Sequence, residues 1–578
     1  MSHRLHSLDD GLCRTVRLLP EGSPENQRLF ATGLLWCYGF HHEEAYRHFS
    51  ALVDRAPECA LGYWGKAYSL APFYNRPWDW FNPTQQIQHA KTGFDAIQSG
   101  LELFCDNTRT DGALNTQPTL AHQLLLRLAL LFRSPQPVDN ETYQSWQTDY
   151  ADAMRTLTET HADHPDVITL TAEAMLNCTP WQHWDIRTGK PNPQSYVLPA
   201  VDLIEKTINR AEPNRSHPGL LHLHIHALEM SPEPQRARSS ATHLRNIGKS
   251  GEPDKNGNVI PPHLPHMATH IDMLTGRYRD AIETNVRAIS FDEKIEPEAD
   301  EFYLISRLHN MHLQLAAAMM AGRLNEATQA RQQIEALVRR SDPHMQDEWL
   351  RLSIEGFYAN RLHTHIRFGD WENLITSKQA ESAETKTTLA SMPFAKAMSV
   401  YARSVAYANS NQSDLAAQGL NALEKLREQV PDWYLINNNP AQRILAVALA
   451  MLEGEWRYHA GEINAGLDKL RHAVALCDQL DYCEPWPWMH PPRHALGALV
   501  LAQNQVDEAT TVYETDLGIN DELPRCLQHP ANLWSLTGLA ECYEAAGNQV
   551  RLDELKNELK IASEYADINI KSSCYCRN

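Results

Sequence analysis

Residues 26–59, "NQRLFATGLLWCYGFHHEEAYRHFSALVDRAPEC", carry the pattern that decides the fold. Apolar residues recur at helical spacing on both sides of a Gly39-containing break, which predicts two helices of about 10–15 residues. Gly33 and Ala45 are small enough to let two antiparallel helices approach, and Phe49 is large enough to fill the gap to a following unit. The stretch therefore predicts a helix–turn–helix unit.

This unit resembles a tetratricopeptide repeat, a helix–turn–helix of 34 residues. Gly33, Ala45, Phe49 and Pro57 fall at positions 8, 20, 24 and 32 of that repeat. Similar helical patterns separated by Gly, Pro or Asn run through the chain, whereas strand signals are scarce. The predicted fold class is all-α, a tetratricopeptide-repeat-like helical solenoid or superhelix with an inner cavity lined by histidines.

A turn motif marks further repeats. It occurs as Gly276-Arg-Tyr-Arg-Asp-Ala281, as Gly322-Arg-Leu-Asn-Glu-Ala327 and, in degenerate form, as Gly369-Asp-Trp-Glu-Asn-Leu374. These glycines are more widely spaced than a 34-residue repeat allows, so the middle repeats carry insertions.

The motifs divide the chain into four parts. We expect N-terminal repeats over 1–105, a helical segment with a long loop over 106–215, central histidine-rich repeats over 216–375 and C-terminal repeats over 376–578. No linker rich in Gly, Pro or Ser separates these parts, so we expect one continuous solenoid.

Composition excludes several classes of function. The 72 acidic residues outnumber the 52 basic ones and give a net charge of −20, which disfavours binding to nucleic acid. The first residues lack the apolar core of a secretory signal, and no apolar run is long enough to span a membrane.

Most of the 11 cysteines are scattered singly, which is typical of reduced thiols in the cytoplasm. The exception, Cys574-Tyr-Cys576, is expected to be a frayed tail rather than a metal site.

Histidines concentrate in "HLHIHALEMS" (222–231) and "HLPHMATHID" (263–272). Spacings of three and four residues place their side chains on one face of a helix. If each turn glycine is position 15 of its repeat, with Pro232 replacing one glycine, the histidines and one glutamate recur at positions 2, 5, 9 and 12. In tetratricopeptide repeats these positions face the concave groove, so the resemblance implies that successive repeats present them to one cavity.

Imidazole is the commonest ligand of transition metals, and H-x-x-x-H on a helix can bring two nitrogens to one ion. The predicted metal ligands are His222, His226, His263, His266, His270, His309 and His312. They are numerous enough for two ions, with His263 and His363 in outer positions. Glu229 is the predicted catalytic residue, acting as a carboxylate ligand, a bridge or a general base. His224 lies on the opposite face from His222 and His226, and His217 is peripheral.

The expected function is that of a metal-dependent oxidoreductase acting on a small-molecule or peptide substrate in the concave groove. Copper or iron is the preferred metal because imidazoles dominate the set, and zinc-assisted hydrolysis is the second choice. The alternative is a scaffold whose polar groove binds a peptide or protein partner without catalysis. Walker, Rossmann, HExxH and GxSxG motifs are absent from the sequence.

A second cluster lies in "DYCEPWPWMHPPRHALGAL", residues 481–499. It contains Trp486, Trp488, His490, Arg493 and His494. The cluster is interpreted either as a packed junction between repeats or as a surface that contacts a ligand.

The histidine blocks also resemble a group of bacterial tetratricopeptide repeat proteins with a histidine-rich central region and mostly unassigned function. The block H-x-x-I-H-A-x-E is matched by His222, Ile225, His226 and Glu229. The resemblance implies a helical superhelix with a shared histidine-rich site and does not supply a reaction.

Overall fold

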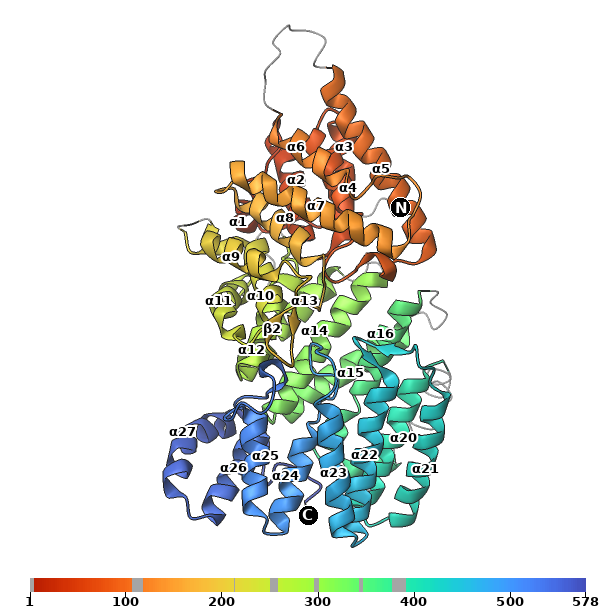
Figure 1. The fold of residues 1–578 in the computed structure, drawn as a ribbon, viewed down its shortest axis with the longest axis vertical. Coiled ribbons are helices and arrows are strands. Elements are labelled where there is room, and N and C mark those ends of the chain that lie inside the picture. The colour runs from red at the N-terminus through yellow and green to blue at the C-terminus, as the bar shows by residue number, and fades with distance from the viewer. Residues whose placement is uncertain are drawn as a thin grey trace. The chain divides into compact units, whose positions relative to one another are not determined.

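The computed structural model describes residues 5–106, 118–210, 212, 214–249, 258–295, 301–341, 347–376 and 391–577. The regular secondary structure of these residues is almost entirely helical (Figure 1). Among them, the only strands are two short antiparallel hairpins, β1 (Trp184–Asp185) with β2 (Lys190–Pro191) and β3 (Leu435–Ile436) with β4 (Asn439–Pro440). The prediction of an all-α, tetratricopeptide-repeat-like fold is confirmed.

Packing divides the chain into two compact units. Unit 1 comprises Met1–Ile271 and Arg287–Tyr303, and unit 2 comprises Asp272–Val286 and Leu304–Asn578. The chain passes from one unit to the other within or beside the helices α12 (His263–Leu274), α13 (Tyr278–Ile295) and α14 (Glu301–Met320). Because helices carry these crossings, no Gly/Pro-rich linker marks them, and the sequence therefore suggested one solenoid.

Unit 1 is built from helices that pack on their neighbours in the sequence. They are α1 (Asp10–Cys13), α2 (Pro24–Tyr38), α3 (His42–Arg55), α4 (Ala60–Tyr68), α5 (Pro83–Asp106), α6 (Leu120–Leu128), α7 (Asn140–Thr160), α8 (Pro165–Leu176), α9 (Val197–Ile208), α10 (Pro218–Leu228) and α11 (Arg238–Asn246). Each helix from α2 to α10 packs on the next, and α10 also packs on α2 and α8. The loop predicted within 106–215 contains the hairpin of β1 and β2.

The first hairpin, α2 and α3, confirms the repeat that its sequence predicted. Phe49 of α3 is fully buried against two glycines, Gly33 of α2 and Gly65 of α4. A Cβ atom on Gly33 would lie 2.8 Å from the Phe49 ring, and one on Gly65 would also collide with it. The aromatic ring thus fills the space that glycine leaves between successive helices.

Unit 2 repeats this arrangement. Its helices after α14 are α15 (Leu324–Arg340), α16 (Glu348–Asn360), α17 (His363–Arg367), α18 (Trp371–Thr376), α20 (Pro393–Asn409), α21 (Ser413–Gln429), α22 (Ala441–His459), α23 (Ile463–Cys477), α24 (Pro492–Ala502), α25 (Val506–Leu517), α26 (Leu533–Ala545) and α27 (Gln549–Tyr565). From α20 onward each helix packs on the next, and α20 packs on α22 as α24 packs on α26. Tyr513 of α25 fits against Gly497 and Gly538, as Phe49 does in unit 1.

The predicted turn glycines have the backbone that the motif requires. Gly276, Gly322 and Gly369 follow α12, α14 and α17 with φ values of +71°, +67° and +64°. Left-handed backbone at the end of a helix favours glycine, so these residues set the repeat boundaries. No helix within the described ranges is long and apolar enough to cross a membrane.

Candidate metal centre

Two segments of unit 1 carry the predicted histidines. The first is α10, which begins at Pro218 with His217 as its N-cap and is buried along its whole length. The second is the start of α12, where His263 is the first helical residue. On each helix, residues four apart lie on one face, so His222 sits above His226, and His266 sits above His270.

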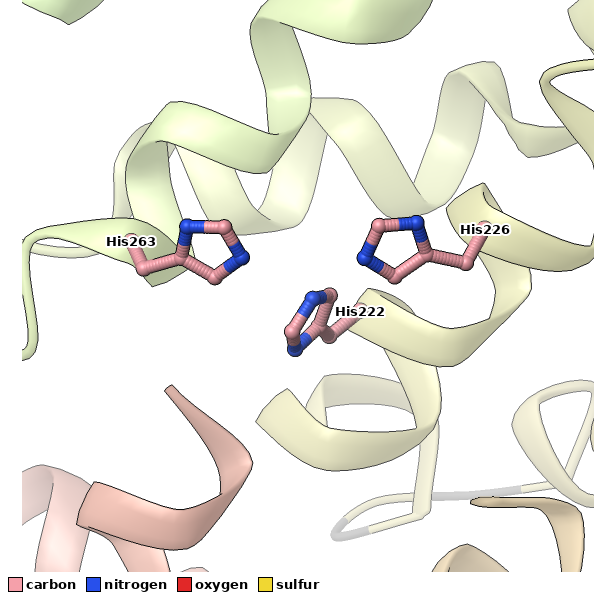
Figure 2. Close-up of side chains that lie close together, drawn as sticks. All are labelled: His222, His226 and His263. Atoms are coloured by element: carbon pink, nitrogen blue, oxygen red, sulfur yellow. The ribbon is translucent and has the colours of Figure 1, made fainter. Parts of the chain in front are cut away.

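Three imidazoles from the two helices converge. The ligating nitrogens of His222, His226 and His263 all lie within 4.8 Å of one another, and Figure 2 shows the three rings turned toward a common space. Their exposed fractions are 1%, 2% and 6%. Zinc binds histidine nitrogen at about 2.0–2.1 Å, which places two nitrogens of a tetrahedral site about 3.4 Å apart. The nitrogens would therefore have to approach one another by up to about 1.4 Å to bind one ion.

His222 is held as the tautomer that carries its hydrogen on Nδ1. Its Nδ1 lies 2.6 Å from the backbone carbonyl oxygen of Tyr38, and since that oxygen only accepts, Nδ1 carries the hydrogen. The lone pair is then on Nε2, which has no hydrogen-bond partner among the described residues. Burial lowers the pKa of His222 to about 3, so the ring is neutral at neutral pH.

Glu229, at the end of α10, contacts two of the histidine rings, those of His226 and His270. Its side chain is fully buried and accepts from Nδ1 of His226 at 2.8 Å and from Nδ1 of His270 at 2.6 Å. A carboxylate that accepts from Nδ1 directs the lone pair of Nε2 toward a metal, which is the usual role of residues just outside a metal site. Nε2 of His270 lies 3.2 Å from Nε2 of His266. The role of Glu229 as a general base stays a prediction.

Aromatic side chains surround the histidines. The ring centroid of Phe40 lies 4.3, 5.6 and 5.4 Å from those of His222, His226 and His263. Tyr74 stacks on His226 at 4.2 Å. The sequence did not single out Phe40 or Tyr74, because both are far from α10 along the chain; the one local signal is that Phe40 follows the glycine of the first repeat turn.

The structure groups the predicted residues differently from the sequence. His263, expected in an outer position, belongs to the three-histidine group because the start of α12 faces α10. His309 and His312 lie in the part of α14 that belongs to unit 2, where the His312 ring packs 5.1 Å from Phe357 and burial lowers its pKa to about 3. Their participation in the metal site stays a prediction.

The peripheral histidines have structural partners. His224 bonds to Ser240 at 2.8 Å and to Glu205 at 3.3 Å, which confirms that it faces away from His222 and His226. His217 bonds to the buried carboxylate of Asp166 at 3.0 Å.

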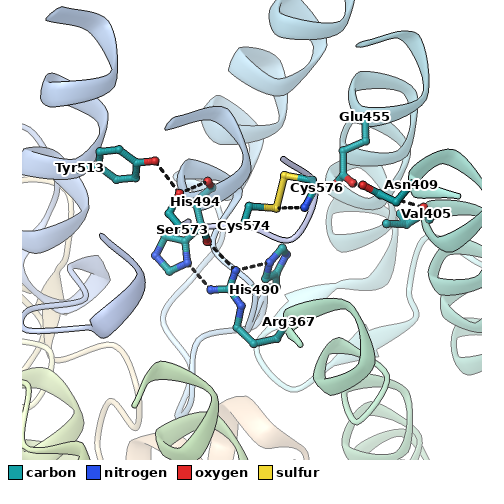
Figure 3. Close-up of a disulfide and its surroundings, with 10 residues drawn as sticks. All are labelled: Arg367, Val405, Asn409, Glu455, His490, His494, Tyr513, Ser573, Cys574 and Cys576. Atoms are coloured by element: carbon teal, nitrogen blue, oxygen red, sulfur yellow. Dashed lines mark hydrogen bonds between the residues drawn. A yellow bond between two sulfur atoms is a disulfide. The ribbon is translucent and has the colours of Figure 1, made fainter. Parts of the chain in front are cut away.

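Two residues of the cluster at 481–499, Trp486 and Arg493, are packed within unit 2. The indole nitrogen of Trp486 donates to the Cys526 carbonyl at 2.9 Å, and Arg493 pairs with Asp478. The C-terminal prediction was wrong: Cys574 and Cys576 are buried and joined by a disulfide instead of fraying, because Ser573 beside them bonds to Tyr513 and to the His494 carbonyl (Figure 3).

No family model and no curated protein matches the chain. Among solved structures it is similar to the human IFIT1 dimer with m7Gppp-AAAA, with 10% identity over 97% of this chain and 96% of that one, at a TM-score of 0.31. It is also similar to yeast Tom70, with 10% identity, coverage of 93% and 92% and a TM-score of 0.26. A third similar structure is the Cut9–Hcn1 hetero-tetramer of APC/C, with 12% identity over 96% of this chain and 95% of that one, at a TM-score of 0.23. At these TM-scores the likeness carries no functional assignment, and the repeat fold rests on the helix pairs described above.

Proposed function

We propose that the chain is a helical-repeat binding protein whose first unit holds one transition-metal ion through His222, His226 and His263. The observation that supports the proposal most directly is the mutual approach of their ligating nitrogens to within 4.8 Å in a buried setting. Two hydrogen bonds also support the proposal, from Nδ1 of His222 to the Tyr38 carbonyl and from Nδ1 of His226 to Glu229. Each places the hydrogen on Nδ1 and leaves the lone pair of Nε2 available to a metal.

The donor set favours copper or zinc. The three-residue group consists of imidazoles alone, a set that suits zinc and copper, whereas non-haem iron usually takes a carboxylate beside two histidines. Glu229 contacts the outer nitrogens of His226 and His270, which makes it an orienting residue in this proposal. Copper, which the sequence analysis preferred, therefore remains a preferred metal in this proposal. Iron, the other metal preferred there, is now less favoured than zinc.

Elemental analysis of tag-free protein, purified without chelating resin, tests the proposal. We expect about one copper or zinc per chain, and loss of that metal in His226→Gln. His224→Gln is the matched control, since it changes a buried histidine of the same helix that faces Ser240 and Glu205. Wild-type protein that contains no copper or zinc and takes up neither on titration would refute the proposal.

The proposal concerns binding and does not require turnover. The predicted oxidoreductase activity is tested by oxygen uptake of the copper-loaded protein, with the metal-free protein as reference.

The stacked helix pairs of unit 2 support a second candidate, the binding of a peptide or protein partner, because such stacks present extended surfaces. Capture of one specific partner by metal-free wild-type protein and by His226→Gln alike would favour this function. The absence of nucleic-acid binding, expected from the net charge of −20, is tested with the same two proteins.

A further inference from the structure

Unit 2 buries an arginine that forms no direct ion pair with any described residue. Arg367 of α17 is 1% exposed, and its guanidinium stacks on Trp534 with 3.9 Å from Cζ to the ring centroid. It donates to Nδ1 of His494 at 2.6 Å, to Nε2 of His490 at 2.7 Å and to the Ser573 carbonyl at 3.1 Å (Figure 3). All three acceptors are uncharged, so no carboxylate is among the hydrogen-bond partners of the cation in the described residues, which is costly in a buried setting.

The carboxylate of Asp516, on the far side of His494, already has several donors. Asp516 lies behind His494 and accepts from its Nε2 at 3.0 Å. It also accepts from His529, Asn532 and Ser535 at 2.8, 2.9 and 2.7 Å. Four donors thus share the negative charge of Asp516, and one imidazole separates it from Arg367.

Beside Arg367, buried polar atoms gather without partners among the described residues. They are both ring nitrogens of His363, Nε of Arg367, the hydroxyl of Tyr401, Oε1 of Glu455, Nε1 of Trp488 and Nδ1 of His490.

These side chains adjoin one another. The ring centroid of Trp488 lies 4.6 Å from that of His363 and 5.3 Å from that of Tyr401. Each of the six residues that carry these atoms is at most 1% exposed. They come from α17, α20, α22 and the loop before α24. Buried polar groups nearly always have hydrogen-bond partners, so such a concentration indicates a bound polar molecule.

The hydrogens on these atoms indicate the charge of that molecule. Nε of Arg367 and Nε1 of Trp488 can only donate. Because Nε2 of His490 accepts from Arg367, its Nδ1 carries the hydrogen and is a third donor. Tyr401 adds a hydroxyl, and burial raises the pKa of Glu455 to about 7, so that its carboxyl group is partly protonated at neutral pH. Two fixed donors, Nε1 of Trp488 and Nδ1 of His490, beside a cation whose own Nε–H is free to donate favour an anion.

We propose that unit 2 holds a second site, independent of the metal, that binds a small organic carboxylate through Arg367, Trp488, His490 and Tyr401. One planar anionic group matches one buried guanidinium and its neighbouring N–H donors. Phosphate carries a larger negative charge than Arg367 neutralises, in a site that also contains Glu455. The faces of Trp488 and Tyr401 suit the organic part of the ligand.

Isothermal titration with acetate, propionate and benzoate tests the site, with inorganic phosphate and chloride as comparison anions. We expect at least one carboxylate to bind, and Tyr401→Phe and Trp488→Phe each to weaken it about 10- to 100-fold by removing one donor to a charged group. Neither variant removes a hydrogen bond seen within the protein. A fall in the melting temperature of the ligand-free protein is therefore not expected from a lost hydrogen bond. Two variants are used so that the test survives if one of them fails to fold.

Tyr143→Phe is the matched control, because Tyr143 is a buried unit 1 tyrosine whose hydroxyl also lacks a partner among the described residues. It should bind the carboxylate as the wild type does. His226→Gln should also bind normally, which separates this site from the proposed metal centre. Failure of all three carboxylates to bind, binding of phosphate or chloride alone, or unchanged affinity in both unit 2 variants would overturn the proposal.

Discussion

Oε1 of Glu229 lies 2.8 Å from Nδ1 of His226, and the two residues are three apart at the C-terminal end of α10. The second oxygen of this carboxylate accepts from His270 of α12, so one buried anion links the two histidine-bearing segments of unit 1. A negative charge in this position fixes the orientation of both rings and would stabilise a cation bound at their Nε2 atoms. In the proposed metal centre, Glu229 would therefore orient the two rings from the side facing away from the metal.

Replacing Glu229 with glutamine should weaken metal binding without removing it. The glutamine amide has one accepting oxygen, so it can satisfy only one of the two Nδ1–H donors and turns its own N–H group toward the other ring. Loss of such an outer partner typically lowers metal affinity 10- to 100-fold. Competition with a chromophoric chelator measures the change. Glu233→Gln, at a largely exposed carboxylate nearby, should keep wild-type affinity; equal affinity in the two variants would contradict the orienting role.

Acid should destabilise the protein between pH 6.5 and pH 3 through its buried histidines. Burial lowers the pKa of His42 and of His183 to about 3. The unfolded chain binds a proton at each below about pH 6.5 while the folded chain does not, so the free energy of unfolding falls as the pH falls through this window. One such histidine costs about 2 kcal/mol between pH 7 and pH 5.

His42→Phe isolates one of these contributions. The His42 ring stacks on Phe73 at 4.1 Å, an arrangement that a phenyl ring can keep. In urea unfolding at pH 7 and pH 5, the loss of stability on acidification should be about 2 kcal/mol smaller than in wild type. His472→Gln, at an exposed position, is the control. An unchanged pH dependence in His42→Phe would show that this ring is protonated in the folded state.

The repeat packing predicts a compensating pair of substitutions. Gly65→Ala places a methyl group against the ring of Phe49, and overpacking of a core typically costs about 1–3 kcal/mol. Phe49→Leu shortens that side chain, so Gly65→Ala should cost less in its presence. A double-mutant cycle in urea measures the coupling. Additive effects of the two substitutions would mean that the ring does not fill the space left by the glycine.

The sequence predicted what depends on local spacing. Gly33, Phe49 and the turn glycines reveal the repeat because helix packing and left-handed turns restrict which residues fit. The pairing of His222 with His226 follows from one helical turn. By contrast, the approach of Phe40 to these rings and the placement of His263 depend on how α2, α10 and α12 pack, which spacing along the chain does not encode. The burial of Cys574 likewise depends on contacts with helices far back in the sequence.

The metal centre is tested most sharply by comparing His263 with His312. Both were predicted ligands, both are buried, and only His263 belongs to the three-histidine group of unit 1. If that group binds the ion, His263→Gln should lower the metal content to background while His312→Gln keeps the wild-type stoichiometry in elemental analysis. Loss of metal in His312→Gln, with an unchanged circular dichroism spectrum, would instead assign a ligand to unit 2 and restore the larger set that the sequence predicted.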